Sequence, residues 1–419
     1  MPQRLEQRCN FCNRPRNEVK KLVAGASEGV HICDRCVANI GTVLSRLKPE
    51  SKTKQLPTGV LYKPKEIVDT LSQFVISQDE AKRELAIAVY EHYRRRNVLQ
   101  SGGTIQLDGE RVDIDKSCVL MLGPSGTGKT MLARAIARML DVPFYVGDAT
   151  RLTQAGYVGD DVESLLQGLM ADAGNDVERA QWGIVFIDEI DKLARKSGRT
   201  ASGYRDVSGE GVQQSLLKLI EGSVVPVSRG RGTSSSGKDM IDTTNILFIC
   251  AGSFAGIEDI IAQRLNKGSR LGFGGELRTE YSKSQLYGAA TVEDIQDFGL
   301  IPELVGRLPV LTSTYELSEE EMVEILTTPN SSVCKQFQAL YALDGIDLQF
   351  EPAALREIAK EAKKRSTGAR ALRSILKTVL KPYSYEAPNE SDIVAIRITR
   401  ESVKKPGTAT VVRRSTARA

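Results

Sequence analysis

The chain has 419 residues, 41% of them apolar, and its 57 Lys and Arg against 53 Asp and Glu give a net charge of +4. This length predicts two or three domains, and the composition excludes a fully disordered or collagen-like chain. No apolar run approaches the roughly 18 residues of a membrane span, and residues 1–16 lack the apolar segment of a secretory signal, so we expect a cytoplasmic protein that does not bind membranes.

The basic charge is concentrated at the two ends of the chain. Residues 1–48 carry nine Lys or Arg and four Asp or Glu, and residues 397–419 carry seven and one. The stretch between these ends is therefore net acidic. A basic end is compatible with nucleic acid, with an acidic partner or with solubility alone, so the net charge does not by itself indicate a nucleic-acid-binding protein.

Four of the seven cysteines form two Cys-x-x-Cys pairs, Cys9 with Cys12 and Cys33 with Cys36. Two such pairs at this separation are typical of a zinc site, where each pair supplies one edge of a tetrahedron. Four thiolates leave no position for water, so we expect structural Zn²⁺. Two disulfides are the alternative, but they need an oxidising compartment. A domain of residues 1–48 buries too little surface to fold securely alone, and the metal is expected to stabilise it.

An apolar run at residues 117–122 leads into a glycine-rich segment and then into a helical pattern. This order of strand, G-x-x-x-x-G-K-[ST] and helix is that of a P-loop. Its residues are Gly123, Pro124, Ser125, Gly126, Thr127, Gly128, Lys129 and Thr130. Backbone N–H groups of such a loop surround phosphates, and the helix N-terminus adds its positive end. We therefore expect ATP here, with Lys129 on the β- and γ-phosphates and Thr130 on Mg²⁺.

A second apolar strand, residues 183–187, ends in Asp188 and Glu189. In this position Asp188 would hold Mg²⁺, and Glu189 would orient and deprotonate the attacking water. A solvated turn is the alternative interpretation of two adjacent acids. Because the pair follows a buried strand downstream of the P-loop, it favours hydrolysis of ATP over storage of the nucleotide.

Strands and helices alternate from about residue 117 to 310, and the strands are almost continuously apolar. This pattern predicts an α/β fold with a parallel sheet, helices on both faces and the ligand at the carboxyl ends of the strands. We expect a linker at 49–65, a large ATPase domain at 66–312, a small helical lid domain at 313–400 and a basic disordered tail at 401–419.

Over residues 5–400 the chain resembles the ClpX family of AAA+ unfoldases, from the four-cysteine domain through the P-loop to the lid. The resemblance implies a homohexamer that unfolds substrate proteins with ATP and passes them to a separate ClpP-type peptidase. It also implies that adaptor proteins bind through the zinc domain.

Two loops carry part of this resemblance. Gly-Tyr157-Val158-Gly is similar to the family's pore loop, which implies that Tyr157 and Val158 grip substrate protein. Leu271, Gly272 and Phe273 resemble the tripeptide that docks into the peptidase ring, where two apolar side chains would act as anchors.

The segment around Val75 and Ile76 resembles the family's adenine pocket, although Ser77 stands where the family has glycine. The basic loop within residues 227–238 departs from the family pattern because it lacks histidine. Recognition of C-terminal degradation tags is therefore not implied in detail.

Two arginines resemble residues that complete the ATPase site. Arg307 is similar to the family's arginine finger, which reaches the γ-phosphate bound by the neighbouring subunit. Arg370, within Gly-Ala-Arg, is similar to the sensor-2 residue of the small domain. The sensor-1 residue is either Asn245 or Ser253, which flank the same apolar strand.

Two other classes of function remain open. A clamp-loader-like nucleic-acid machine also combines a four-cysteine module with AAA+ motifs, and a regulatory module could hold ATP without hydrolysing it. The two loop motifs and the lack of a broad basic stripe disfavour the first, and the Asp188–Glu189 pair disfavours the second. We expect no nucleic-acid partner, and with His31 and His92 as the only histidines we expect no Ser–His–Asp peptidase site.

Overall fold

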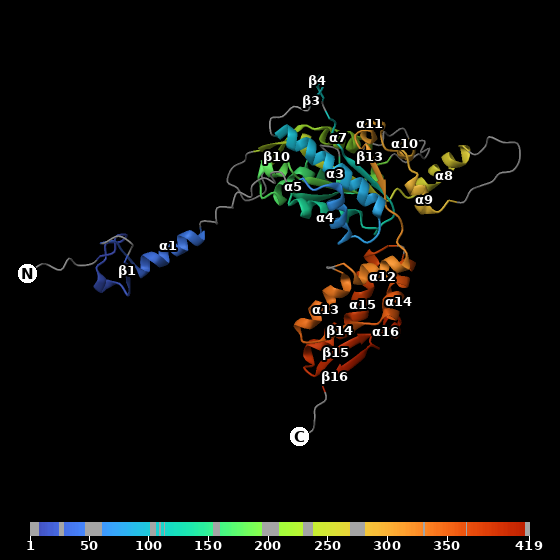
Figure 1. Cartoon of the computed structure of the whole chain (residues 1–419). Coiled ribbons are helices and arrows are strands. Elements are labelled where there is room, and N and C mark those ends of the chain that lie inside the picture. The colour runs from blue at the N-terminus through green and yellow to red at the C-terminus, as the bar shows by residue number, and fades with distance from the viewer. Residues whose placement is uncertain are drawn as a thin grey trace, which may run out of the picture. The chain divides into compact units, whose positions relative to one another are not determined.

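The structure is a computed structural model that describes residues 8–24, 29–46, 61–100, 106–108, 110–112, 114–153, 160–194, 209–228, 238–268, 281–329, 332–365 and 367–414. They belong to two units, Met1–Thr58 and Gly59–Ala419, and each is described by itself (Figure 1). Within the described ranges, no helix combines the length and the apolar character needed to cross a membrane.

The N-terminal unit is small, and few of its described side chains are buried. Its elements are the 3-10 turn η1 (Arg16–Glu18), strands β1 (Leu22–Ala24) and β2 (His31–Cys33), and helix α1 (Asp34–Arg46). The two strands pair in antiparallel register, with Leu22 opposite Cys33. Among the side chains described in this unit, those of Cys9 and Cys33 are the buried ones. Cysteine side chains, rather than large apolar ones, therefore form the buried centre of the described part of this unit.

The second unit contains a five-stranded parallel sheet. Its strand order is β13 (Val310–Ser313), β5 (Val119–Leu122), β12 (Leu247–Gly252), β9 (Ile184–Asp188) and β6 (Phe144–Asp148). All residues of β5 and β12 are buried, as expected for strands covered on both faces. The predicted α/β fold with a parallel sheet is confirmed.

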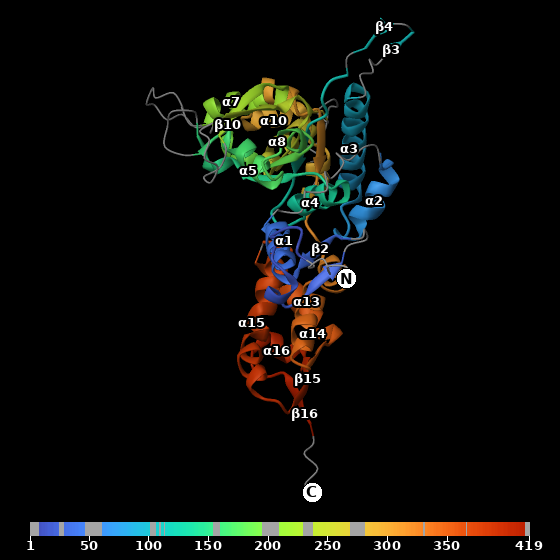
Figure 2. The ribbon, with the colours of Figure 1, turned by 90° about the vertical axis from the view of Figure 1, so that its left-hand side faces the viewer.

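Helices cover both faces of this sheet. They are α2 (Pro64–Ser72), α3 (Asp79–Gln100), α4 (Lys129–Leu140), α5 (Ser164–Asp172), α6 (Val177–Ala180), α7 (Gly209–Glu221), α8 (Ile257–Gly268), α9 (Lys283–Gly288), α10 (Val292–Phe298) and α11 (Pro302–Gly306). Figure 2 shows α2 and α3 at one side of this domain and α5 and α7 at the other. The short strand pairs are β3 (Gln106–Leu107) with β4 (Glu110–Arg111), β7 (Leu152–Thr153) with β8 (Asp160–Asp161), and β10 (Val224–Ser228) with β11 (Lys238–Asp242).

A second, separate apolar core lies in the small domain that follows the sheet. Its helices are α12 (Glu319–Thr327), α13 (Val333–Leu343), α14 (Pro352–Lys364), α15 (Arg370–Glu386) and α16 (Arg400–Lys404), and its strands are β14 (Asp347–Phe350), β15 (Ile393–Ile398) and β16 (Thr410–Arg413). Helix α12 begins with a capping box, in which Glu321 N–H donates to Ser318 Oγ at 3.1 Å and Ser318 N–H to the Glu321 carboxylate at 2.7 Å. This explains why the helix begins where the sequence predicts.

The prediction of a disordered tail is wrong for residues 401–414. Strand β16 pairs antiparallel with β15, so that Val411 lies opposite Ile396 and packs on the small-domain core. The basic Arg413 pairs with Asp392 at 2.9 Å. The basic composition of this segment favours disorder, but its apolar residues complete a sheet whose other strands lie earlier in the chain. Residues 415–419 lie outside the described residues.

The predicted linker also ends earlier than expected. Helix α2 begins at Pro64, a favoured first helical residue, and Lys63 N–H donates to the Glu66 carboxylate at 2.8 Å. Residues 64 and 65 are therefore helical. Residues 49–60 lie outside the described residues.

Candidate nucleotide site and metal centre

The P-loop connects the carboxyl end of β5 to the start of α4. Gly123 and Gly126 have φ of +131° and +78°, which L side chains rarely adopt. A Cβ on Gly123 would lie 2.2 Å from the carbonyl oxygen of Thr314, and one on Gly126 would lie 2.3 Å from that of Thr367. The two glycines therefore allow the loop to approach both the end of β13 and the small domain.

Lys129 is the first residue of α4, and its side chain is buried within the loop. Its ammonium donates to the carbonyl oxygens of Gly123 at 2.6 Å and Pro124 at 2.8 Å. Burial lowers the pKa of Lys129 to about 8, and the carboxylate of Asp188 opposes that shift. The predicted phosphate-binding cation thus lies inside the loop whose backbone would surround the phosphates.

Strand β9 ends at Asp188, so this residue lies at the carboxyl ends of the strands, as the P-loop does. The Thr130 hydroxyl donates to Asp188 Oδ2 at 3.4 Å, and Glu189 N–H donates to Asp188 Oδ1 at 3.0 Å. Hydroxyl and carboxylate oxygens are ligand types that Mg²⁺ accepts alongside phosphate oxygens. Glu189 has φ of +58°, which is uncommon for a residue other than glycine, and such backbone strain often marks a functional site.

Asp191 and Ser253 form a contact that the sequence did not predict. Ser253 donates to the Asp191 carboxylate from both its N–H and its hydroxyl, each at 3.1 Å. Ser253 directly follows β12, at the carboxyl ends of the strands. Asn245 lies before that strand, in η4 (Thr243–Asn245). Of the two candidates for sensor 1, Ser253 is therefore the one on the side of the P-loop.

The small domain contacts the P-loop through the start of α15. Arg370 donates to the Ser125 hydroxyl at 3.3 Å, and Ala369 N–H donates to the carbonyl oxygen of Gly126 at 3.1 Å. Arg370 thus lies beside the loop that would hold the phosphates, although 245 residues separate it from Ser125 in the chain.

Val75 and Ile76 precede α3 and are 6% and 8% exposed. A Cβ on Gly128 of the P-loop would lie 3.3 Å from a methyl group of Val75, so this apolar segment borders the loop. Ser77, the residue that departs from the family's glycine, has φ of +57°. Burial opposes ionisation of Glu321, but hydrogen bonds from the Ser77 side chain and the Ser318 backbone hold the pKa of that carboxyl below its usual value.

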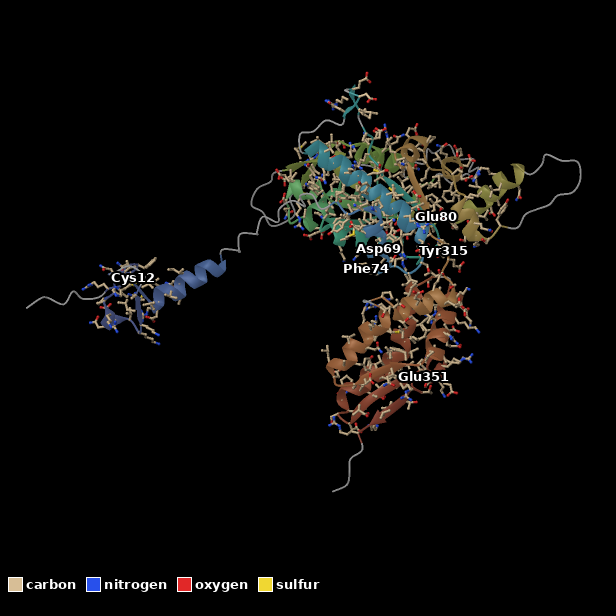
Figure 3. The ribbon with its side chains drawn as sticks, viewed as in Figure 1. Cys12, Asp69, Phe74, Glu80, Tyr315 and Glu351 are labelled. Atoms are coloured by element: carbon tan, nitrogen blue, oxygen red, sulfur yellow. The ribbon has the colours of Figure 1, made fainter. Side chains whose placement is uncertain are left out.

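The next residue, Gln78, joins this segment to the chain entering the small domain. Its amide donates to the Tyr315 carbonyl oxygen at 2.9 Å and accepts from Tyr315 N–H at 3.0 Å. Figure 3 labels Tyr315 where the chain passes into the small domain. Neither contact could be predicted, because the two residues are 237 positions apart.

Arg307 lies at the amino ends of the sheet strands, whereas the P-loop lies at their carboxyl ends. It follows α11 and precedes β13, which runs parallel to β5 with Val310 beside Val119, the first residue of β5. The P-loop follows the last residue of β5. The structure therefore separates Arg307 from the phosphate-binding loop of its own chain, and its guanidinium pairs with Glu221 at 3.0 Å.

The sulfur atoms of Cys9, Cys12, Cys33 and Cys36 lie within 4.8 Å of one another. Cys9 and Cys36 sulfurs are 3.9 Å apart, and those of Cys12 and Cys33 are 3.6 Å apart. Tetrahedral Zn²⁺ with bonds of about 2.3 Å places its sulfur ligands about 3.8 Å apart, so the cluster fits the metal. Burial opposes ionisation of Cys9, but hydrogen bonds from backbone groups of Cys12, Phe11 and Cys33 outweigh it and lower its pKa to about 6. Burial and the neighbouring thiols raise the pKa of Cys36, so the geometry of the four sulfur atoms is what supports the metal site.

The predicted pore and docking loops cannot be placed. Tyr157 and Val158 fall between β7 and β8, and Leu271, Gly272 and Phe273 fall between α8 and α9. All five lie outside the described residues.

Models of three known families match successive parts of the chain. The ClpX C4-type zinc finger matches residues 7–46, the AAA domain (Cdc48 subfamily) matches residues 115–311, and the C-terminal D2-small domain of ClpB protein matches residues 317–399. The curated relatives named ATP-dependent Clp protease ATP-binding subunit ClpX include that of Treponema denticola, 44% identical over 91% of this chain and 90% of the relative. The chain belongs to the ClpX family.

Other ClpX relatives give the same result. That of Porphyromonas gingivalis is 46% identical over 92% of both chains, and that of Azotobacter vinelandii is 44% identical over 92% of this chain and 87% of the relative. As a ClpX-family member, the chain is an AAA ATPase that uses ATP and Mg²⁺. Its four-cysteine cluster is the zinc centre of the ClpX finger.

Proposed function

We propose that the chain couples ATP hydrolysis to the unfolding and translocation of substrate proteins and delivers them to a separate ClpP-type peptidase. The observation that carries this proposal is the contact of the small domain with the P-loop. Gly126 lies against Thr367, and Arg370 reaches Ser125. A nucleotide on this loop would contact both domains, so a change in its phosphates could alter how the domains are held, which is what a mechanical ATPase requires.

The residues at the carboxyl ends of the strands have separate roles in ATP binding and hydrolysis. Lys129 and the backbone N–H groups of the loop bind phosphate oxygens, and Thr130 and Asp188 would hold Mg²⁺, which neutralises phosphate charge when bound. Glu189 takes a proton from the attacking water. Arg370 adds a positive charge from the small domain.

The oligomer in this proposal is a homohexameric ring. The placement of Arg307 supports this ring. The residue is half-exposed and lies at the amino ends of the strands, away from the P-loop of its own chain. In a ring, this residue would meet the nucleotide of the neighbouring copy and stabilise charge in the transition state.

The remaining assignments rest on membership of the ClpX family. We assign substrate gripping to Tyr157 and Val158, peptidase docking to Leu271, Gly272 and Phe273, and the binding of adaptors to the zinc domain. A cytoplasmic location belongs to the same proposal, because the cysteines that bind zinc stay reduced in a reducing compartment.

The test is degradation of a stable, tagged protein by the full chain with ATP, with and without a candidate ClpP-type peptidase. We expect degradation only when chain, ATP and peptidase are all present. Degradation without the peptidase would contradict the division of labour. Salt-sensitive DNA binding with DNA-stimulated ATP hydrolysis would instead favour a nucleic-acid machine.

A further inference from the structure

The guanidinium of Arg307 is held by one side chain. Its Nε donates to Glu221 Oε1 at 3.0 Å, and the two side chains are 52% and 40% exposed. Within the described residues, the two terminal nitrogens of Arg307 have no hydrogen-bond partner. One edge of the guanidinium is therefore engaged by the carboxylate, and the pair of nitrogens that can bind phosphate in a bidentate way is left available.

The end of α7 that carries Glu221 is itself anchored. The Lys116 ammonium donates to the carbonyl oxygens of Ile220 at 3.2 Å and Thr243 at 2.9 Å. The Thr243 hydroxyl donates to the carbonyl oxygen of Leu219 at 2.9 Å. A partly buried cation and a hydroxyl thus satisfy carbonyl groups of the last helical turn, which fixes the backbone beside Glu221.

Glu221 and Arg307 line a pocket of about 540 Å³, in which four basic side chains outnumber two acidic ones. Its other charged lining residues are Arg95, Arg111, Asp115 and Lys116. A terminal nitrogen of Arg95 is buried without a hydrogen-bond partner. This excess of cations suits an anionic group, such as the terminal phosphate of a nucleotide, approaching from outside the chain.

We propose that Glu221 is a positioning residue for Arg307. Its carboxylate restricts the rotamers of the long arginine side chain and turns the two terminal nitrogens toward the phosphate bound by a neighbouring copy. The inference rests on the proposed function, in which Arg307 acts on that neighbouring nucleotide. Glu221 itself contacts neither substrate nor water of reaction, and it acts only through the arginine.

The test compares steady-state ATP hydrolysis of the full chain with that of Glu221→Gln and Glu221→Asp. We expect Glu221→Gln to lower kcat about 2- to 5-fold, the range set by one exposed charge pair. KM should be unchanged, because the P-loop lies at the other ends of the strands. Glu221→Asp, which keeps the charge, should recover part of the rate. Glu361→Gln is the matched control, because Glu361 is 36% exposed and pairs with Lys364 at 2.6 Å in the small domain, and it should leave kcat unchanged.

A double-mutant cycle separates this inference from the proposed function. In the Arg307→Ala background, Glu221→Gln should have no further effect on kcat, because the residue it positions is absent. If Arg307→Ala does not slow hydrolysis, the proposed role of Arg307 is wrong. If Arg307→Ala slows hydrolysis but Glu221→Gln alone equals or exceeds the wild-type rate, the positioning role alone is overturned. The same holds if Glu221→Gln acts only by dissociating the oligomer.

Discussion

In the N-terminal unit, the buried side chains among those described belong to two cysteines, whereas the ATPase unit buries two large apolar clusters around its sheets. Several apolar side chains described in the N-terminal unit are instead exposed, with Phe11 at 66% and Val37 at 48%. Because hydrophobic stabilisation scales with the apolar area removed from water, the two units cannot be stable for the same reason. One unit therefore depends on a metal and the other on packing, so the two should unfold under different conditions.

The largest expected effect is that of zinc removal. A chelator should unfold the N-terminal unit, since structural zinc contributes on the order of 10 kcal/mol to a module of this kind. The thermal transition of the ATPase unit should not change once Mg²⁺ is restored. Limited proteolysis and zinc analysis report the two outcomes. A metal-free N-terminal unit that still resists protease would contradict the comparison.

The converse test is a cavity in the ATPase unit. Leu216 on α7 is fully buried in the large-domain core, so Leu216→Ala should lower the free energy of unfolding of this unit by about 2–5 kcal/mol. Bound zinc should stay unchanged, because the metal lies in the other unit. Leu343→Ala is the control, since this leucine is 84% exposed and its loss should cost less than about 0.5 kcal/mol. Equal losses from the two substitutions would show that burial does not set the stability.

The smallest effect is a pH dependence that belongs to the ATPase unit. Burial, aided by nearby Lys116, lowers the pKa of His92 to about 3, and its Nε2 lies 3.1 Å from the carbonyl oxygen of Asn245. Folded His92 therefore stays neutral, while the unfolded chain takes up a proton below about pH 6.5, so stability is lost as the pH falls through this region. Between pH 7 and 5.5, the wild type should lose about 1 kcal/mol more than His92→Gln in urea unfolding. If the free energy of unfolding depends on pH in the same way in both proteins, His92 is not the cause of this loss.

The sequence predicted those parts of the site whose residues are close together in the chain. The P-loop, the Asp188–Glu189 pair and the four cysteines are local patterns, and each lies where its pattern required. The contact of Arg370 with the P-loop is not local, and only the resemblance to ClpX indicated it. The strand β16 was missed because its partner, β15, determines its structure more than its own charge does.

Other contacts had no signal in the sequence at all. Asp191 with Ser253 and Glu221 with Arg307 are pairs of common polar residues brought together by the order of strands in the sheet. Their separation along the chain matches neither a helical nor a strand repeat, so these contacts become apparent only in the folded structure.

In the proposed function, the P-loop site converts ATP hydrolysis into protein unfolding. The most direct test follows the loss of fluorescence of a stable, tagged fluorescent protein with the full chain, ATP and Mg²⁺, in parallel with Glu189→Gln. We expect the wild type to unfold this substrate in proportion to ATP turnover, and the variant to bind ATP with an unchanged Kd while its turnover falls about 10²- to 10⁴-fold and unfolding stops. Rapid ATP hydrolysis by the wild type without unfolding of any tagged substrate, or wild-type turnover by Glu189→Gln, would contradict the account.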